Sequence, residues 1–195
     1  MSQRLKPATP PFAPAIQQAL DRTMPPGAPP LTLFATLARD ERLFGKFFAG
    51  GLLDKGHLTL RQREIVIHRV TAQCGSVYEF GVHVALFAAR AQLDAAQIAA
   101  LAHGGDVGHG GAQEHGGAKE TVWSAQDRVL IRLCDALHAG CDVADALWAE
   151  LGAYFTEEAL LELLLLAGFY RTVSYLTNAL RLPLEPFAAP FPSAQ

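Results

Sequence analysis

The sequence predicts an all-α protein with a single hydrophobic core, on three observations. Its apolar residues recur every three or four positions, which is the spacing of an amphipathic helix and not of a strand. The turns between apolar stretches lack the dipeptides typical of β-hairpins. Half of the 195 residues are hydrophobic, so the chain can bury one core and does not require a second domain. We expect one helical domain over residues 31–182, between an N-terminal arm over 1–30 and an irregular tail over 183–195.

The N-terminal arm is rich in proline, with eight of the twelve prolines of the chain in its thirty residues. Proline lacks a backbone N–H and interrupts helices, so the arm has room for at most one short helix, around residues 13–21. Helical spacing begins at Leu31 and continues to Phe48, until Gly50 and Gly51 interrupt it. This stretch predicts two short helices.

Two longer helices come next, each opened by a sequence typical of a capping box. Thr59–Gln62 begins an apolar helix that contains Glu64 and ends near Gly75. Ser76–Glu79 begins a second helix, which runs to about Arg90. Because the turn between them is so short, the two helices are expected to form an antiparallel hairpin, which we place at the centre of the fold.

The middle of the chain combines a short helix over residues 94–101 with a glycine-rich segment over 103–119. Seven glycines raise the entropy cost of ordering this segment, so we expect a mobile loop. Its three histidines are six residues apart, at His103, His109 and His115, and this spacing matches no rigid metal site. We expect neither a metal nor a cofactor.

Three helices are predicted in the last part of the chain. The first covers residues 123–140 and is opened by a capping-box sequence, and a short helix over 142–151 follows it. The last long helix begins near residue 156 and ends before the prolines of the tail. Its residues 160–166 are apolar on nearly every side, so we expect this helix to be central or to lie at a subunit interface.

Charge and cysteine content narrow the class of function. The net charge is −3, from 16 basic and 19 acidic residues spread along the chain, so no basic stripe is available for nucleic acid or an anionic membrane. The apolar run Leu163–Tyr170 is far shorter than the ~20 residues of a membrane span. Three cysteines without a repeated spacing suit a reducing compartment. We expect a cytoplasmic protein that binds neither nucleic acid nor membrane.

Glu64 and His83 are the side chains from which a catalytic site is most readily assembled. At about 100° per residue, Ser76, Glu79 and His83 share one face of the second hairpin helix, and the hairpin brings Glu64 towards that face. A carboxylate beside an imidazole suits proton transfer, although it is also a common structural ion pair. His68, four residues after Glu64, is an alternative partner within the same helix.

Residues along most of the chain are spaced as in a known family of helical proteins. They are Leu58-x-x-Arg61-x-Arg63-Glu64-Ile65-Val66-Ile67-x-Arg69-Val70, Cys74-x-Ser76-x-Tyr78-Glu79-Phe80-x-x-His83, Trp123-Ser124 with Asp127, Asp135-x-Leu137, and Gly168-x-Tyr170 before Asn178-Ala179. In these residues the chain resembles the carboxymuconolactone decarboxylase and alkylhydroperoxidase D-like superfamily. The resemblance implies the helical fold of that superfamily, formed around the central helix hairpin.

The chain departs from part of this superfamily at two positions. The alkylhydroperoxidase members have a glutamate, then C-x-x-C, then a histidine four residues after the second cysteine. By resemblance Glu64 and His83 match the glutamate and histidine, but Ser76 and Glu79 occupy the cysteine positions and cannot cycle through a disulfide. A capping box explains both residues, and a second catalytic carboxylate is the alternative role for Glu79. The decarboxylase branch uses acid–base chemistry on a small lactone acid, which fits Glu64 and His83 better than peroxide reduction.

Cys74 offers thiol chemistry as an alternative. It lies two residues before a helix start, where backbone N–H groups favour a thiolate that could attack a peroxide. It would then need an outside thiol, or Cys134 or Cys141 close by, to complete a cycle. A small buried apolar residue is the structural alternative for Cys74. Tyr78, four residues on, could line the same pocket or simply pack in the core.

Our leading hypothesis is a cofactor-free, carboxymuconolactone decarboxylase-like enzyme acting on a small lactone, carbonyl or carboxylic acid. In it Glu64 takes or orients a proton, and His83 donates a proton or holds an oxyanion. The substrate pocket would be formed around them by Ser76, Tyr78, Glu79 and Phe80.

Two other functions stay open at this stage. One is a peroxidase-related antioxidant protein that uses Cys74. The other is a non-catalytic helical assembly module in which Glu64 and His83 form a buried pair, and a site closed above His83 would favour it. The family resemblance implies a homo-oligomer, a trimer, hexamer or dimer. Three aromatic residues are most simply assigned to the core, namely Trp123, Trp148 and Tyr170.

Overall fold

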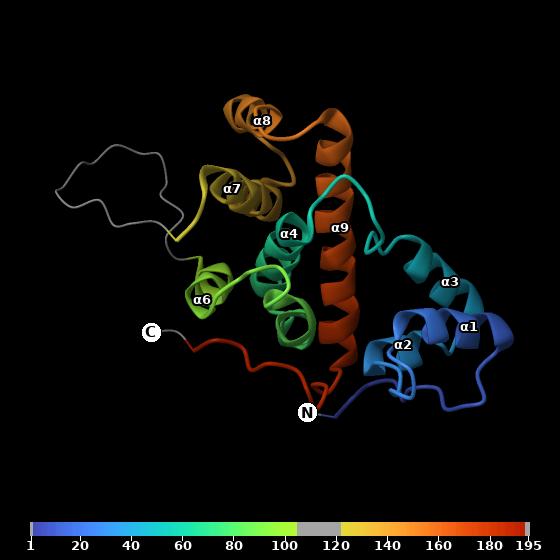
Figure 1. Cartoon of the computed structure of the whole chain (residues 1–195). Helices are drawn as coiled ribbons and strands as arrows, with labels where there is room; N and C mark the ends of the chain where they lie inside the picture. The colour runs from blue at the N-terminus through green and yellow to red at the C-terminus, as the bar shows by residue number, and fades with distance from the viewer. Residues whose placement is uncertain (1, 105–121, 194–195) are drawn as a thin grey trace.

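The computed structural model describes residues 2–104 and 122–193, and these contain helices and no strand (Figure 1). The all-α fold expected from the sequence is therefore confirmed. The helices in chain order are α1 (Pro14–Thr23), α2 (Thr32–Leu37), α3 (Glu41–Ala49), α4 (Leu60–Gln73), α5 (Val77–His83), the π-helical turn η1 (Val84–Ala88), α6 (Ala95–His103), α7 (Ala125–Gly140), α8 (Asp145–Gly152) and α9 (Glu157–Leu180). Residues 105–121 lie outside the described part, so the loop expected there, with His109 and His115, is not described.

Helix α4 lies at the centre of the fold and packs against α5, α6, α7 and α9. Three successive residues, Ile65, Val66 and Ile67, have no exposed surface, because neighbouring helices cover α4 on nearly every side. Gly75, with φ of +63°, supplies the left-handed backbone conformation that the tight turn into α5 requires. The central helix hairpin is thus present as predicted.

Side-chain caps begin several helices where the sequence indicated them. Complete capping boxes open α4 at Thr59, α6 at Asp94 and α7 at Ser124. Helix α8 begins at Asp145 and not at Asp142, because the carboxylate of Asp142 accepts a hydrogen bond from the backbone N–H of the next residue. The second hairpin helix also differs from the expectation, since regular α-helix stops at His83 and continues as η1.

Helix α9 runs alongside α4 and is the longest helix described. It is long and apolar enough to cross a membrane by length and composition alone, but 44% of its apolar stretch is already buried within the fold. Its outer face remains apolar, with Leu161 63% and Leu165 64% exposed. The assignment of Trp148 to the core is wrong, because this residue of α8 is 43% exposed, whereas Trp123 and Tyr170 are buried.

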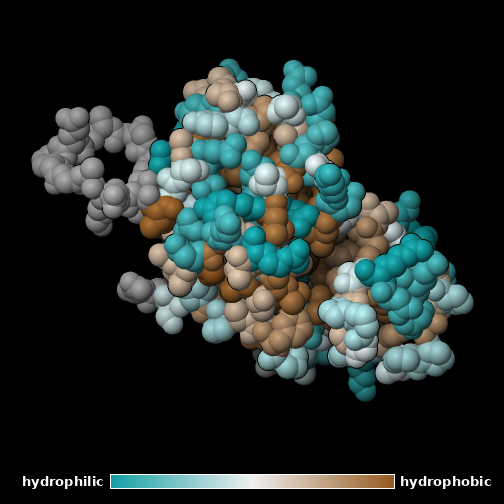
Figure 2. Space-filling view, viewed as in Figure 1, coloured by the Kyte–Doolittle hydropathy of each residue, from teal (hydrophilic) through white to brown (hydrophobic). Residues whose placement is uncertain are grey.

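Helices α1 to α3 form a separate lobe with a small core of Ile16, Leu20 and Phe44. Phe47 of α3 meets Phe169 of α9 with 5.1 Å between the ring centroids, which joins the lobe to the rest of the protein. Figure 2 shows apolar surface in the recess between this lobe and the main body.

The C-terminal tail crosses the outer side of α5. The backbone N–H of Ala189 donates to the carbonyl of Gly81 at 3.0 Å, and Phe191 packs on Phe80 with 4.8 Å between the ring centroids. A Cβ atom on Gly81 would lie 2.5 Å from the carbonyl oxygen of Ala189, so a residue without a side chain is required for this close approach. The tail therefore holds α5 against the body of the protein from outside.

Candidate functional site

Glu64 and His83 meet directly between α4 and α5. The Nδ1 atom of His83 lies 2.8 Å from Glu64 Oε2, a hydrogen bond in which the imidazole N–H donates to the carboxylate. The Glu64 side chain is fully buried and that of His83 is 4% exposed. The short turn after α4 determines this pairing, because it folds α5 back along the face that carries Glu64.

The other nitrogen of His83 faces two further groups. Its Nε2 lies 3.3 Å from Glu79 Oε1, one turn earlier on α5, and 3.1 Å from the hydroxyl of Tyr170 on α9. Glu79 is the most exposed of the four, with 10% of its side chain accessible. We name Glu64, Glu79, His83 and Tyr170 the acid–base cluster.

The cluster favours the charged imidazole. Burial by itself lowers the pKa of His83, but the charge of Glu64, the hydrogen bond to it, and the hydrogen bond and charge of Glu79 together raise this pKa to about 9. His83 therefore carries its proton at neutral pH. Burial, followed by the charges of Glu79 and Glu64, raises the pKa of Tyr170 well above its usual value, so its hydroxyl stays neutral.

His68 is the weaker partner of Glu64. Its Nδ1–H donates to the backbone carbonyl of Glu64 at 2.6 Å, and the same nitrogen is 3.8 Å from the Glu64 carboxylate. Burial lowers the pKa of His68 to about 4 against the opposing charge of Glu64, and the charge of His83 lowers it further. His68 is therefore neutral at pH 7, and His83 is the charged partner of Glu64.

Two carboxylate oxygens of the cluster have no hydrogen-bond partner among the described residues, Glu64 Oε1 and Glu79 Oε2. Arg63 lies near the first, with its Nε 3.8 Å from Glu64 Oε1. Buried carboxylate oxygens are normally hydrogen-bonded, because leaving one unpaired costs about 1–3 kcal/mol or more. These oxygens can therefore accept a proton or a hydrogen bond from a molecule that enters the site.

The capping box predicted at Ser76 and Glu79 is wrong. Ser76 is the N-cap residue of α5, but its side chain makes no capping hydrogen bond. Its hydroxyl instead shares a hydrogen bond of 2.7 Å with that of Thr177 on α9. Glu79 turns towards His83, because an imidazolium in a buried site attracts its carboxylate more strongly than a backbone N–H does.

Tyr78 and Phe80 point away from the acid–base cluster. The hydroxyl of Tyr78 donates to the carboxylate of Glu185 in the tail and accepts from the backbone N–H of Leu33 at 3.2 Å. Burial, and then the hydrogen bond to Glu185, raises the pKa of Tyr78, so it is a neutral donor. Phe80 is fully buried and lies edge-on to the ring of His68, with 5.1 Å between the ring centroids.

Cys74 is separated from the cluster along α4. It caps the C-terminus of that helix, ten residues beyond Glu64, and α-helical rise places the two about 15 Å apart along the axis. It is half-buried, and its carbonyl accepts a hydrogen bond of 2.8 Å from Asn178. Of the other two cysteines, Cys134 is buried and Cys141 exposed, and all three are free thiols.

Tyr170 and Thr177 were missed as site residues by the sequence analysis. Both lie on the apolar helix α9, where Tyr170 was assigned to the core. A signal did exist, since a buried tyrosine hydroxyl needs a hydrogen-bond partner, and α9 offers none from its own apolar side chains. Which neighbour supplies the partner depends on helix packing and was not readable from the spacing.

The acid–base cluster is closed in this structure. A hollow in the described part of the chain lies elsewhere, between α4, α7 and α9. The same residues also contain no group of three histidine, cysteine or carboxylate side chains arranged to hold a metal ion. An imidazolium between two carboxylates is an arrangement that can hold and move protons.

Comparisons with known proteins agree with this architecture. The model of the carboxymuconolactone decarboxylase family matches residues 42–121, the region that contains the hairpin. The match covers 80 of the 195 residues, and over them the chain is similar to this family, while it lacks the C-x-x-C motif. No curated protein matches the sequence at a significant level.

Two solved structures share the fold over nearly the whole chain. One is a peroxidase-related protein from Silicibacter sp. TM1040, with a TM-score of 0.76, 14% identity, and 97% of this chain and 96% of that chain covered. The other is described as an alkylhydroperoxidase AhpD core, a peroxidase-related protein from Ralstonia eutropha JMP134, with a TM-score of 0.72, 17% identity, and coverage of 90% and 87%. At these identities the likeness concerns the fold.

Proposed function

We propose that this protein is a carboxymuconolactone decarboxylase-like enzyme that transfers protons on a small lactone, carbonyl or carboxylic acid. One observation carries the proposal. A buried imidazolium lies between two carboxylates, and each carboxylate has an oxygen without a hydrogen-bond partner. Such an arrangement places an acid and a base within reach of one substrate.

Each member of the cluster then has a distinct role. Glu64 is fully buried, so it orients His83 and stabilises its charge through Nδ1. His83 carries the proton and donates it, or holds an oxyanion, through Nε2. Glu79 is the most exposed member, so the substrate would meet the cluster from its side once that side opens, and its buried Oε2, which has no partner, would accept the proton.

Geometry favours proton transfer over a peroxidase-related reaction at Cys74. Cys74 lies about 15 Å along α4 from Glu64, so its thiol is not in contact with that carboxylate. Mass spectrometry after exposure to a slight excess of hydroperoxide tests this choice. A sulfenic acid or disulfide at Cys74, together with peroxide consumption, would assign the activity to the thiol instead.

Turnover of a panel of lactones and small carboxylic acids tests the proposal itself. Replacing His83 by Gln removes the proton donor, and we expect a loss of at least about 100-fold in kcat/KM. Glu79→Gln is expected to have an effect of similar size, because it removes the base. His57→Gln is the matched control, since His57 is exposed and lies outside the cluster. Full activity in both cluster variants would refute the assignment.

The closure of the cluster supports one competing function, a non-catalytic assembly module. In that case the imidazolium and its carboxylates only stabilise the fold, and the exposed leucines of α9 contact another copy of the chain. Light scattering measures the oligomeric state, and a homo-oligomer in the cytoplasm is our proposal under either function. An assembled wild-type protein that turns over nothing on the panel would favour the module.

A further inference from the structure

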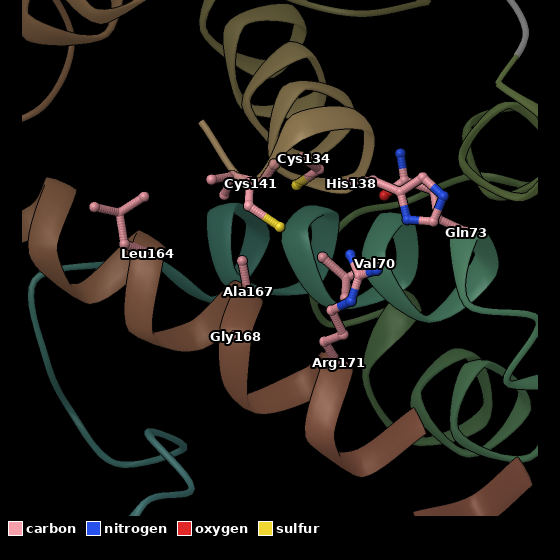
Figure 3. A pocket seen from close by; sticks show the side chains of 10 residues that line it. Val70, Gln73, Cys134, His138, Cys141, Leu164, Ala167, Gly168 and Arg171 are labelled. Carbon is pink, nitrogen blue, oxygen red and sulfur yellow. The ribbon is translucent and has the colours of Figure 1, made fainter. Parts of the chain in front are cut away.

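A hollow of about 170 Å³ lies between α4, α7 and α9 (Figure 3). Its wall is largely apolar, with Val70 from α4, Leu137 from α7, and Leu164 and Ala167 from α9. Its volume is close to that of apolar cavities of about 150 Å³ that bind benzene in another protein. The hollow therefore has room for a six-membered ring or a short aliphatic chain.

This hollow is separate from the acid–base cluster. Counting about 100° per residue, Val70 and Gln73 lie 180° to 240° round α4 from Glu64, on the far side of the helix. None of Glu64, Glu79, His83 and Tyr170 lines it. The hollow is consequently a second candidate site and not an extension of the first.

Arg171 supplies an unpaired positive charge at this hollow. It lines the hollow one turn after Ala167, and Figure 3 shows it beside Val70 at the wall. Its Nε donates to the hydroxyl of Tyr175 at 3.0 Å, but no carboxylate of the described residues lies within ion-pair distance of it. The two terminal nitrogens of its guanidinium therefore remain available to a ligand, and a planar guanidinium pairs best with a carboxylate or phosphate.

Other polar groups at the hollow do not compensate this charge. Cys134 is buried, and burial raises the pKa of its thiol to about 12, so it contributes a neutral surface. The nearby Asp135 is engaged elsewhere, since it pairs with Arg69 at 2.7 Å. His138 lines the same hollow and offers a further N–H donor at its edge.

We propose that this hollow binds a small monocarboxylate with an aromatic or short aliphatic body. The carboxylate pairs with Arg171, and the body packs on the apolar wall formed by Val70, Leu137 and Leu164. A carboxylate is favoured over phosphate because most of the ligand would contact apolar side chains, which suits an amphipathic molecule of this size. The inference goes beyond the proposed function, because it concerns binding at a different place in the fold.

Isothermal titration of the full-length protein with sodium benzoate tests the proposal. We expect saturable one-site binding with a Kd of about 1 mM or tighter. Arg171→Gln removes the charge and should weaken binding at least about tenfold. Gly168→Leu should abolish it, because Gly168 lines the hollow and the new side chain would fill it. A Cβ at Gly168 meets no atom within 4 Å, so this variant is expected to fold.

Two controls separate this site from general effects. Arg22→Gln removes an equal charge from α1, far from the hollow, and should leave the Kd unchanged. Benzyl alcohol has the same body without the charge and should bind at least about tenfold more weakly than benzoate. Equal binding of the two compounds, no saturable binding, or an unchanged Kd in Arg171→Gln and Gly168→Leu would each overturn the proposal. A change of oligomeric state in Gly168→Leu without any benzoate binding would overturn it too, and would assign this face to a second copy of the chain.

Discussion

Replacing Glu64 by Gln removes a buried charge from the acid–base cluster and nearly preserves its shape. Burial then acts on His83 with only Glu79 to oppose it, so the pKa of His83 falls from about 9 towards or below its ordinary 6.5. The interval between 6.5 and 9 corresponds to about 3 kcal/mol, which is the stability that the protonated imidazole contributes.

The pH dependence of stability follows from the direction of this shift. The pKa of His83 is higher in the folded protein than in the unfolded chain, so its contribution is complete below pH 6.5 and is lost as the pH rises through about 9. The free energy of unfolding of the wild-type protein should therefore fall by up to about 3 kcal/mol across this interval. Glu64→Gln should be destabilised at pH 6.5 and should show a much smaller fall.

Urea unfolding between pH 6.5 and about 9.5 measures the free energy of unfolding, and NMR titration of the histidine rings measures the pKa of His83. His138→Gln is the control, because removing an exposed histidine should leave the fall in stability between these values intact. The electrostatic argument is refuted if the wild-type His83 ring titrates near 6.5. It also fails if Glu64→Gln retains the wild-type pH dependence.

Three further substitutions test contacts around the cluster. Tyr170→Phe keeps the ring but removes the hydroxyl that contacts the imidazole of His83. We expect the free energy of unfolding in urea to fall by about 1 kcal/mol, and kcat to fall as well. Unchanged stability and kcat would show that the hydroxyl contributes to neither. Ser76→Ala leaves the buried hydroxyl of Thr177 with one hydrogen-bond partner fewer, so the free energy of unfolding should fall by about 1–3 kcal/mol. Adding Thr177→Val to this variant removes the unpaired hydroxyl and should recover part of the lost stability. Gly81→Ala places a Cβ 2.5 Å from the carbonyl oxygen of Ala189, so the free energy of unfolding should fall by about 1–3 kcal/mol. Hydrogen exchange at the Ala189 N–H should become faster, because this group bonds to Gly81. Wild-type protection of that N–H in the variant would contradict the tail contact.

The hairpin and its acid–base pair were predictable because they depend on local sequence. Nineteen residues separate Glu64 from His83, and capping residues, apolar spacing and one short turn determine how the two helices meet. The contact with Tyr170 spans 87 residues, so it depends on how α9 rotates against α4 and α5. Spacing within one helix does not reveal that rotation.

Ser76 and Glu79 show how one pattern supports two structures. The sequence S-x-x-E matches a capping box, but the same spacing places Glu79 one turn before His83. A charged imidazole in a buried site attracts the carboxylate more strongly than the backbone does, and only the fold shows that the imidazole is buried. Trp148 was misplaced for a related reason, since helical spacing alone did not reveal which side of α8 faces solvent.

The long separation between Tyr170 and the hairpin has a consequence for protein synthesis. Glu64 and His83 leave the ribosome close together, but α9, which contributes Tyr170, is made later, so the pair first forms in contact with water. In such a nascent chain His83 would exchange its proton as an ordinary exposed histidine does. Once α9 has packed on the hairpin, burial opposes the charge of His83, and the carboxylates of Glu64 and Glu79 keep the imidazole protonated against it.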